Sequence, residues 1–174
     1  NTGVCKTCNM YINCGDFCVR DISDDDAESY YEIFSNPEVA RYDDFEPISR
    51  ADLLVDMARI AGQAPGSLLR EFAVALPEDD KMVGVLTLEK KRLYTYIGYH
   101  FNPDYQGRGY ALRSVVALIN SLGEEVQASL RLVSDPENHA SVALAEKAGF
   151  VFLKRRKHKG VPEVMYVYKG NKQD

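Results

Sequence analysis

Apolar and polar side chains alternate along several short stretches of this sequence, as they do in half-buried β-strands. Between residues 70 and 76, Phe72, Val74 and Leu76 fall on one side of an extended chain. Two similar stretches follow, and the turn formers Pro77-Glu78-Asp79-Asp80 separate the first from the second. This order predicts a meander of antiparallel strands. The predicted strands span residues 17–22, 70–76, 82–88, 93–101, 129–133, 150–155 and 164–168.

Four other stretches carry apolar residues at intervals of three and four, which is the spacing of one face of an α-helix. In the second of them Leu53, Met57 and Ile60 share a face, and Ser49 with Asp52 forms a start that resembles a capping box. The predicted helices span residues 23–34, 49–61, 109–122 and 138–148. Strands, then a strand–helix–strand unit, then two final strands predict a mixed α/β sheet of the α+β kind.

Length and composition place the chain among ordinary globular domains. Its 174 residues suit one domain, and 45% hydrophobic with 27% charged residues exclude disorder, collagen-like repeats and coiled coil for most of the chain. No apolar run approaches the roughly 20 residues of a membrane helix, and the polar, cysteine-bearing start lacks a secretory pattern, so we expect a cytoplasmic protein. The net charge of −5 argues against nucleic acid as a partner and tolerates a cationic amine.

All four cysteines lie in the first 18 residues, with the spacing C-x2-C-x5-C-x3-C. One hypothesis is a structural zinc site with four thiolate ligands. Against it, the spacing is tighter than in two-knuckle zinc sites and the last cysteine falls in a predicted strand; free thiols or a disulfide are the alternatives. The candidate ligands are Cys5, Cys8, Cys14 and Cys18. We divide the chain into a cysteine-bearing N-terminal appendage, residues 1–15, and one domain, residues 16–174.

A glycine-containing turn links the predicted strand 93–101 to the predicted helix 109–122. Residues 102–111 have the sequence Asn-Pro-Asp-Tyr-Gln-Gly-Arg-Gly-Tyr-Ala. Such a turn leaves backbone N–H groups unpaired at a helix start, where the helix dipole also attracts anions, so a phosphate or diphosphate is the expected ligand. No Gly-Lys-Ser or Gly-Lys-Thr follows, and Leu112 replaces the third glycine of a dinucleotide motif, so neither of those nucleotide sites fits. A plain turn with helix-packing glycines is the alternative.

Two further strings accompany this turn. Gln106-Gly107-Arg108-Gly109-Tyr110-Ala111 fits the pattern Q-x-x-G-x-G/A, Asn138-x-x-Ser141 opens the next predicted helix, and Glu146-Lys147-x-Gly149-Phe150 closes it. Together they resemble the GNAT superfamily of acyl-CoA-dependent N-acyltransferases. Other strings resemble its Rim-type branch, the ribosomal-protein N-acetyltransferases; they are Val19-Arg20-Asp21-Ile22, residues 36–42 and Ile97-Gly98-Tyr99. The resemblance covers residues 17–168.

The resemblance implies a mostly antiparallel mixed sheet of six or seven strands with about four helices, splayed between the fourth and fifth strands. Acetyl-CoA as cosubstrate would lie in that opening, with its pantetheine arm along the fourth strand and its diphosphate on the glycine turn. The residues implied to bind it are Tyr99, His100, Phe101, Gln106, Gly107, Arg108, Gly109, Tyr110, Ala111, Asn138 and Ser141. Dimers are common in the superfamily, so a homodimer is a further expectation.

The implied reaction is direct attack of a neutral primary amine, a protein N-terminus or a small amine, on the acetyl thioester. Many superfamily members protonate the leaving thiolate with a tyrosine at the position of Ala145, so Ser141 is the candidate acid here, as in the Rim-type branch. Tyr96 replaces the usual glutamate base, and a tyrosine with its reference pKa near ~10 is a weak base at neutral pH. His100, on the same strand face as Tyr96, is the candidate substitute.

Ordinary structural roles compete with these assignments. Ser141 is also a first-turn hydroxyl, and His100 is also a packed strand histidine. Asp43, Asp44 and Glu46 fall in the loop that would line the acceptor groove, where they would bind a cationic acceptor or lie in solvent. A non-catalytic acyl-CoA-binding or sensing domain and a zinc-stabilised interaction module are the competing functions.

A basic run, residues 154–159, falls at a predicted hairpin turn. Such runs usually form a solvated face. The alternatives are contact with RNA, with an acidic peptide or with the 3′-phosphate of coenzyme A. Arg108 and Arg113, on the glycine turn and the first turns of its helix, are the nearer candidates for phosphate contact.

Overall fold

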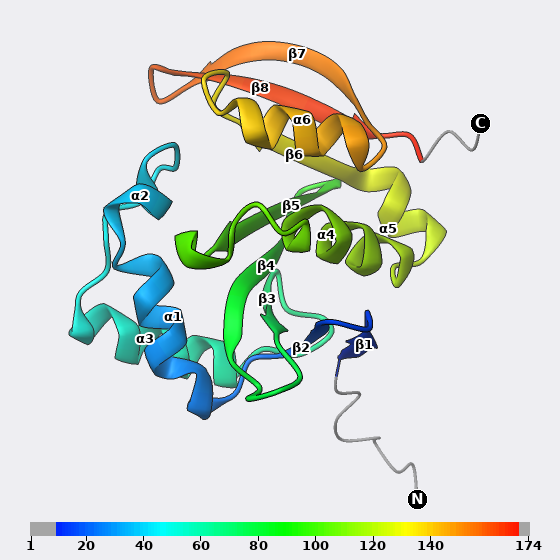
Figure 1. The fold of residues 1–174 in the computed structure, drawn as a ribbon. Coiled ribbons are helices and arrows are strands. Elements are labelled where there is room, and N and C mark those ends of the chain that lie inside the picture. Colours follow the sequence, from blue (N-terminus) through cyan, green and yellow to red (C-terminus); the bar gives the residue numbers. More distant parts are fainter. Residues whose placement is uncertain (1–9, 171–174) are drawn as a thin grey trace, which may run out of the picture.

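The computed structural model describes residues 10–170, which form one sheet flanked by helices (Figure 1). Within this range the sheet has eight strands in the order β1-β2-β3-β4-β5-β6-β8-β7. The strands are β1 (Tyr11–Asn13), β2 (Cys18–Asp21), β3 (Leu69–Ala75), β4 (Met82–Lys91), β5 (Tyr94–Phe101), β6 (Leu130–Ser134), β7 (Phe150–His158) and β8 (Val161–Tyr168).

The same range contains six α-helices and two short 3₁₀ helices. They are η1 (Asp24–Asp26), α1 (Ala27–Phe34), α2 (Pro37–Ala40), α3 (Arg50–Ala61), η2 (Pro103–Tyr105), α4 (Tyr110–Asn120), α5 (Glu124–Ser129) and α6 (His139–Lys147). None of the helices in this part of the chain combines the length and the apolar character needed to cross a lipid bilayer.

Neighbouring strands are antiparallel except β5 and β6, which run parallel. In the described residues these two strands pair only at Thr95 with Leu130 and at Tyr96 with Arg131. Beyond Tyr96 they separate, whereas β4 and β5 pair along their whole length (Figure 1). The sheet is therefore splayed between its predicted fourth and fifth strands, and the mixed, mostly antiparallel fold class is confirmed.

Two hydrophobic clusters hold the helices on the sheet. Helices α4 and α6 pack through Val115 and Leu144 in a cluster that includes Phe72 of β3. Helices α1 and α3 pack through Ile33 and other apolar residues in a second cluster that includes Ala73. Successive strand residues point to opposite faces, so the two clusters cover the two faces of the sheet.

Helix α3 begins where the sequence predicts it. Ser49 Oγ accepts a hydrogen bond from Asp52 N at 3.1 Å, and the Asp52 carboxylate accepts one from Ser49 N at 2.8 Å. The expected capping box is thus present, and it satisfies two backbone N–H groups at the helix start.

Some short elements differ from the prediction. Asn36 and Pro37, expected to form a turn, instead begin α2: the Asn36 side chain accepts from Glu38 N at 3.0 Å, and Pro37 takes the first helical position. The six-residue α5 and three-residue β1 were also not expected, and the helix expected over residues 23–34 is divided into η1 and α1. Elements this short contain too few turns or alternations to give a periodic pattern.

The sheet extends into the predicted N-terminal appendage. Strand β1 pairs antiparallel with β2, and Met10 N donates a hydrogen bond to Asp21 Oδ2 at 2.8 Å. The described part of the appendage, residues 10–15, is therefore hydrogen-bonded to the rest of the domain. The boundary drawn after residue 15 stays a prediction.

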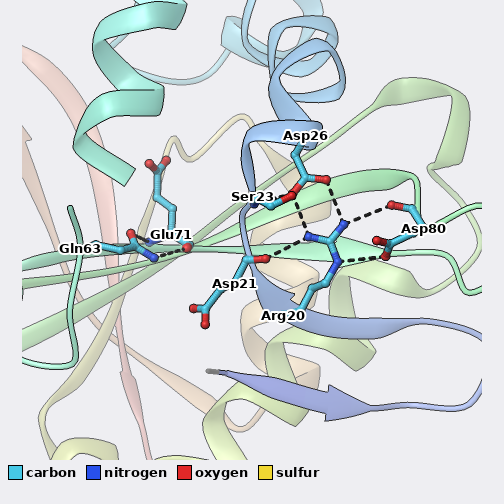
Figure 2. Close-up of polar contacts among 7 residues, drawn as sticks. All are labelled: Arg20, Asp21, Ser23, Asp26, Gln63, Glu71 and Asp80. Atoms are coloured by element: carbon cyan, nitrogen blue, oxygen red, sulfur yellow. Dashed lines mark hydrogen bonds and ion pairs between the residues drawn. The ribbon is translucent and has the colours of Figure 1, made fainter. Parts of the chain in front are cut away.

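Arg20 joins three segments of the fold in a polar network (Figure 2). Its Nη1 and Nη2 donate to the Asp26 carboxylate at 2.8 and 2.9 Å, and its Nε donates to Asp80 Oδ1 at 3.0 Å. Asp26 also accepts from Ser23 N at 2.8 Å. The Arg20 side chain is 14% exposed and that of Asp26 is 4% exposed. This buried ion pair fixes the start of α1 against β2 and the β3–β4 turn.

A second polar group lies at the end of α3. The Gln63 side chain accepts from Glu71 N at 2.9 Å and donates to Glu71 O at 2.8 Å, and so caps the β3 backbone from outside (Figure 2). The buried Glu71 carboxylate in turn accepts from Arg59 Nη2 at 2.6 Å and from the Tyr30 hydroxyl at 3.2 Å. Burial, together with the Glu71 charge, raises the pKa of Tyr30.

Candidate active site

A cavity of about 390 Å³ lies where β5 and β6 separate. Its walls come from the two separating strands, the start of α6, the loop after α2 and the β7–β8 hairpin. The lining residues are 41–44, 97–100, 132–135, Asn138, Ser141, His158 and 161–163. Segments that are far apart in sequence, such as residues 41–44 and 161–163, therefore meet at the gap in the sheet.

The start of α6 brings two predicted site residues to the cavity. Asn138 is the N-cap, and its Oδ1 accepts a hydrogen bond from Ser141 N at 3.2 Å. Ser141 is buried, lines the cavity and lies beside Tyr99. Burial raises the pKa of Tyr99, and interaction with the Ser141 side chain opposes that rise. Tyr99, Asn138 and Ser141 thus form one polar corner of the cavity.

The glycine turn has the conformation that an anion site needs. Gly107 and Gly109 have φ angles of +78° and +77°, a left-handed conformation that favours glycine. Gln106 N donates to Pro103 O at 3.3 Å, but no acceptor within residues 10–170 takes the backbone N–H groups of residues 107–111. Helix α4 carries no acidic residue in its first turn. The amides and the helix dipole are therefore available to an anion.

The two arginines near the turn differ in their surroundings. The Arg108 guanidinium lies over the Tyr105 ring, 5.4 Å from its centroid. Arg113 is held by Asp16 of the β1–β2 turn, with Nη1–Oδ1 and Nη2–Oδ2 distances of 2.7 and 2.9 Å. Its Nη2 also donates to Arg108 O at 3.4 Å. Arg113, expected as a phosphate neighbour, thus already has a carboxylate partner.

His100 reaches the cavity beside one of the predicted acidic residues. Its Nε2 lies 3.1 Å from Asp43 Oδ2, and its ring packs against Phe34 and Phe45 with centroid distances of 5.2 and 5.3 Å. His100 Nδ1 is buried and has no hydrogen-bond partner in the described chain. A neutral imidazole that donates Nε2–H to Asp43 therefore keeps Nδ1 as a free acceptor.

Several predicted residues are not brought to this cavity. Tyr96 is absent from the cavity lining that the described residues form. Its ring lies instead near Lys91, whose Nζ is 5.8 Å from the ring centroid. Glu46 is absent from the same lining, unlike Asp43 and Asp44. Phe101 is buried over Gly84, where a Cβ would come within 2.3 Å of the ring. The glycine turn, residues 106–111, also lies outside the lining.

The zinc hypothesis gains no support. Cys5 and Cys8 lie outside the described residues, and Cys14 and Cys18 are free thiols whose pKa values are raised, chiefly by burial. Among residues 10–170 no group of three or more His, Cys, Asp or Glu side chains could hold a metal ion. Neutral thiols are poor metal ligands, so this environment favours the free-thiol alternative for Cys14 and Cys18.

The sequence did not predict the far wall of the cavity. His158 and Glu163 of the β7–β8 hairpin line it, and Glu163 Oε2 accepts from Arg156 Nε at 2.7 Å. At the hairpin tip Lys159 Nζ donates to Asp44 Oδ2 at 3.3 Å, which joins the hairpin to the loop after α2. The basic run was the sequence feature that marked this wall.

Comparisons with known sequences agree with this geometry. The sequence model of a family described as an acetyltransferase (GNAT) domain matches residues 16–151. Among curated proteins, the uncharacterized N-acetyltransferase YnaD of Bacillus subtilis (strain 168) is 26% identical over 143 residues. That match covers 80% of this chain and 82% of YnaD.

Solved structures share the fold. An acetyltransferase of the GNAT family from Bacillus anthracis superposes with a TM-score of 0.78 at 23% identity, over 90% of this chain and 96% of that one. RimL, a ribosomal L7/L12 alpha-N-protein acetyltransferase in complex with coenzyme A, superposes with a TM-score of 0.74 at 16% identity, over 90% and 96%. At these identities the structures show a common fold.

Proposed function

Because this chain belongs to the GNAT acetyltransferase family, we propose that it transfers the acetyl group of acetyl-CoA to a primary amine that attacks the thioester directly. The observation that carries the proposal is the pairing of an open strand edge on β5 with a turn whose amides have no acceptor among residues 10–170. An amide-bearing arm that ends in a diphosphate suits both features.

The cosubstrate supplies the activated acetyl group, and the chain's own groups would bind and orient it. The amides of residues 107–111 would hold the diphosphate, while the backbone of Tyr99, His100 and Phe101 would pair with the pantetheine amides. Asn138 and Ser141 would lie beside the thioester end. Support comes from the cavity, because Tyr99 of β5 lines it together with Asn138 and Ser141 at the start of α6.

Proton transfer is assigned to two cavity residues. His100 would accept the proton of the attacking amine, and Asp43 would stabilise the imidazolium that results. Because Nδ1 is buried, the ring would have to turn toward the cavity for that nitrogen to receive the proton. Ser141 would donate a hydrogen bond to the leaving thiolate. Tyr96, which replaces the usual glutamate, is removed from this scheme because it lies outside the cavity lining of the described chain.

The acceptor is proposed to be a protein N-terminus, with a small amine as the alternative. The RimL neighbour is described as an alpha-N-protein acetyltransferase. Four carboxylates line the cavity, those of Asp43, Asp44, Asp135 and Glu163, and they suit a cationic end. We also expect a cytoplasmic protein, and the homodimer stays a prediction.

The test measures thiol release from acetyl-CoA against peptides with free N-termini and against small primary amines. The Ser141→Ala variant is expected to lower kcat about tenfold, because one hydrogen bond to the thiolate is lost. Ser29→Ala serves as the control, since Ser29 lies on α1 away from the cavity lining. The absence of turnover with every amine would refute the proposal.

A non-catalytic acyl-CoA sensor is the second candidate. The observation that favours it is Ala145, which is fully buried in the α4–α6 cluster and has no group that could protonate a thiolate. Calorimetry with acetyl-CoA separates the two candidates. Binding without turnover of any amine, unaltered by Ser141→Ala, would establish the sensor.

A further inference from the structure

The outer strand of the sheet carries a concentrated positive charge. Residues 154–159 of β7 and its turn hold five of the chain's 21 lysines and arginines and none of its 26 acids. Every side chain from Val151 to Gly160 is exposed. Lys154, Arg155 and Lys157 form no ion pair with any acid in residues 10–170, although Arg156 and Lys159 do. The run therefore keeps three unneutralised cations within four positions.

This strand leads directly to the cavity. His158, its last residue, lines the cavity, as do Val161 and Glu163 of the paired strand β8. His158 is opposite Val161, and Arg156 is opposite Glu163. Directly opposed residues of an antiparallel pair point to the same face, so the face that carries Arg156 and His158 is the one that turns toward the cavity.

The outer edge of β7 is free to pair with another chain. In residues 10–170 β7 pairs with β8 alone and ends the strand order (Figure 1). A register shift lies between Phe152 and Lys154, and from Lys154 to His158 the pairing with β8 is regular. The segment therefore presents an unbroken row of backbone donors and acceptors toward solvent.

We propose that the outer edge of β7, residues 154–158, docks an acidic polypeptide acceptor as an added strand whose N-terminal amine enters the cavity. This inference rests on the proposed function and names its substrate class. Since His158 is at the cavity end of β7, a peptide with its N-terminus there must run back along the strand, antiparallel to it. Its carboxylates would then lie beside Lys154, Arg155 and Lys157, and its backbone would complete the edge.

Charge complementarity selects this occupant over two others. A second copy of the chain added edge to edge at β7 would place like charges side by side, which disfavours it. RNA would use the cations but not the backbone edge. The chain as a whole has a net charge of −5, which argues against RNA as the partner. An acidic peptide uses both the charges and the edge.

The experiment compares peptides that share their first three residues and differ behind them. Positions 4–7 of the peptide hold four acidic residues, four serines or four lysines. A further set of peptides has its four acidic residues at positions 6–9. The ratio of kcat/KM for the best acidic peptide to that for the serine peptide is expected to be at least about tenfold, and to fall with added salt. In the K154E/K157E variant this ratio is expected to fall to one or below.

The matched control is K90E/K91E, which reverses two exposed lysines at the β4–β5 turn. It is expected to keep the acidic preference of the wild type. An equal loss of preference in both variants would show that net charge, not the β7 edge, is responsible, and would overturn the proposal. Equal turnover of acidic, serine and lysine peptides by the wild type would overturn it as well, while leaving the proposed function intact.

Binding is measured separately, so that failure of turnover does not decide the matter. The anisotropy of a labelled acidic peptide is recorded with wild type and K154E/K157E, together with a peptide whose alternate backbone nitrogens are methylated. Weaker binding by the variant and by the methylated peptide supports strand addition. Equal binding of both peptides, or tighter binding of an oligoribonucleotide that displaces the acidic peptide, would overturn it.

Discussion

Polar groups are satisfied in one region of the sheet, around β2, and left unpaired in another, around the splay between β5 and β6. On the closed side, Arg20 donates to Asp26, Asp80 and the Asp21 carbonyl, so its guanidinium is fully satisfied. At the splay, His100 Nδ1 is buried without a partner in the described chain, and the amides of residues 107–111 have no acceptor there. Satisfied groups hold the fold, whereas the unpaired amides of the glycine turn are available to a ligand.

Breaking the closed side is expected to have the largest effect. Arg20→Ala leaves the Asp26 carboxylate buried without its counter-charge, which costs about 3–5 kcal/mol of the free energy of unfolding. Arg50→Ala is the control: it removes an exposed ion pair between Arg50 of α3 and Glu28 of α1, and it is expected to have a small effect. Urea unfolding followed by circular dichroism measures both. Similar midpoints for the two variants would contradict the distinction between the two sides.

Replacing His100 is expected to leave the fold intact and to slow the reaction strongly. His100→Gln keeps a polar side chain in the cavity but cannot accept a proton, so kcat is expected to fall about 10²–10⁴-fold. His139→Gln, at the exposed start of α6, is the control. The measurement is kcat against pH with acetyl-CoA and a primary amine. A variant with the wild-type rate and pH profile would exclude His100 as the base.

The closed side was the more predictable of the two. Its apolar residues lie within strongly periodic stretches, and local patterns fix their faces, as with Phe72 and Val74 on β3. The contact between Arg20 and Asp80, 60 positions apart, was not predicted. The glycine turn was also predictable, because positive φ angles at Gly107 and Gly109 impose a local requirement on the residue type. Both the strand faces and the glycine turn are determined by residues that are close together in the sequence.

The splay cavity required contacts that no local pattern contains. His100 meets Asp43 across 57 positions, and Lys159 meets Asp44 across 115. Tyr96 and His100 share a strand face, as parity predicts, yet only His100 lies beyond the point where β6 separates from β5. Where two strands part depends on the packing of the whole sheet, so the sequence could rank the candidates but not choose between them.

A smaller change tests whether the glycine turn belongs to the open side. Gly109→Ala puts a Cβ at a positive φ, which costs about 1–2 kcal/mol, and places it 3.6 Å from Arg113 Nε. The turn then shifts its amides, and affinity for acetyl-CoA is expected to fall about tenfold, together with a loss of stability of about 1–2 kcal/mol. Gly66→Ala is the control, because that glycine has open space and no positive φ. Calorimetry with acetyl-CoA would show equal affinities if the turn were only a packing device.

The smallest expected effect concerns the ion pair between Asp16 of the β1–β2 turn and Arg113 of α4. Asp16 holds Arg113 beside the turn, and the hydrogen bond from Arg113 lowers the pKa of Asp16. A lowered pKa keeps the pair ionised at neutral pH and loses it only as the pH falls through the lowered value. Asp16→Asn removes one negative charge near the proposed diphosphate site, so affinity for acetyl-CoA is expected to rise about two- to threefold at low salt and less at high salt. Asp25→Asn, an exposed acid of η1, is the control, and calorimetry at two salt concentrations measures both. A fall in affinity for Asp16→Asn would mean instead that the carboxylate is needed to position Arg113, which would place this pair with the satisfied groups of the closed side.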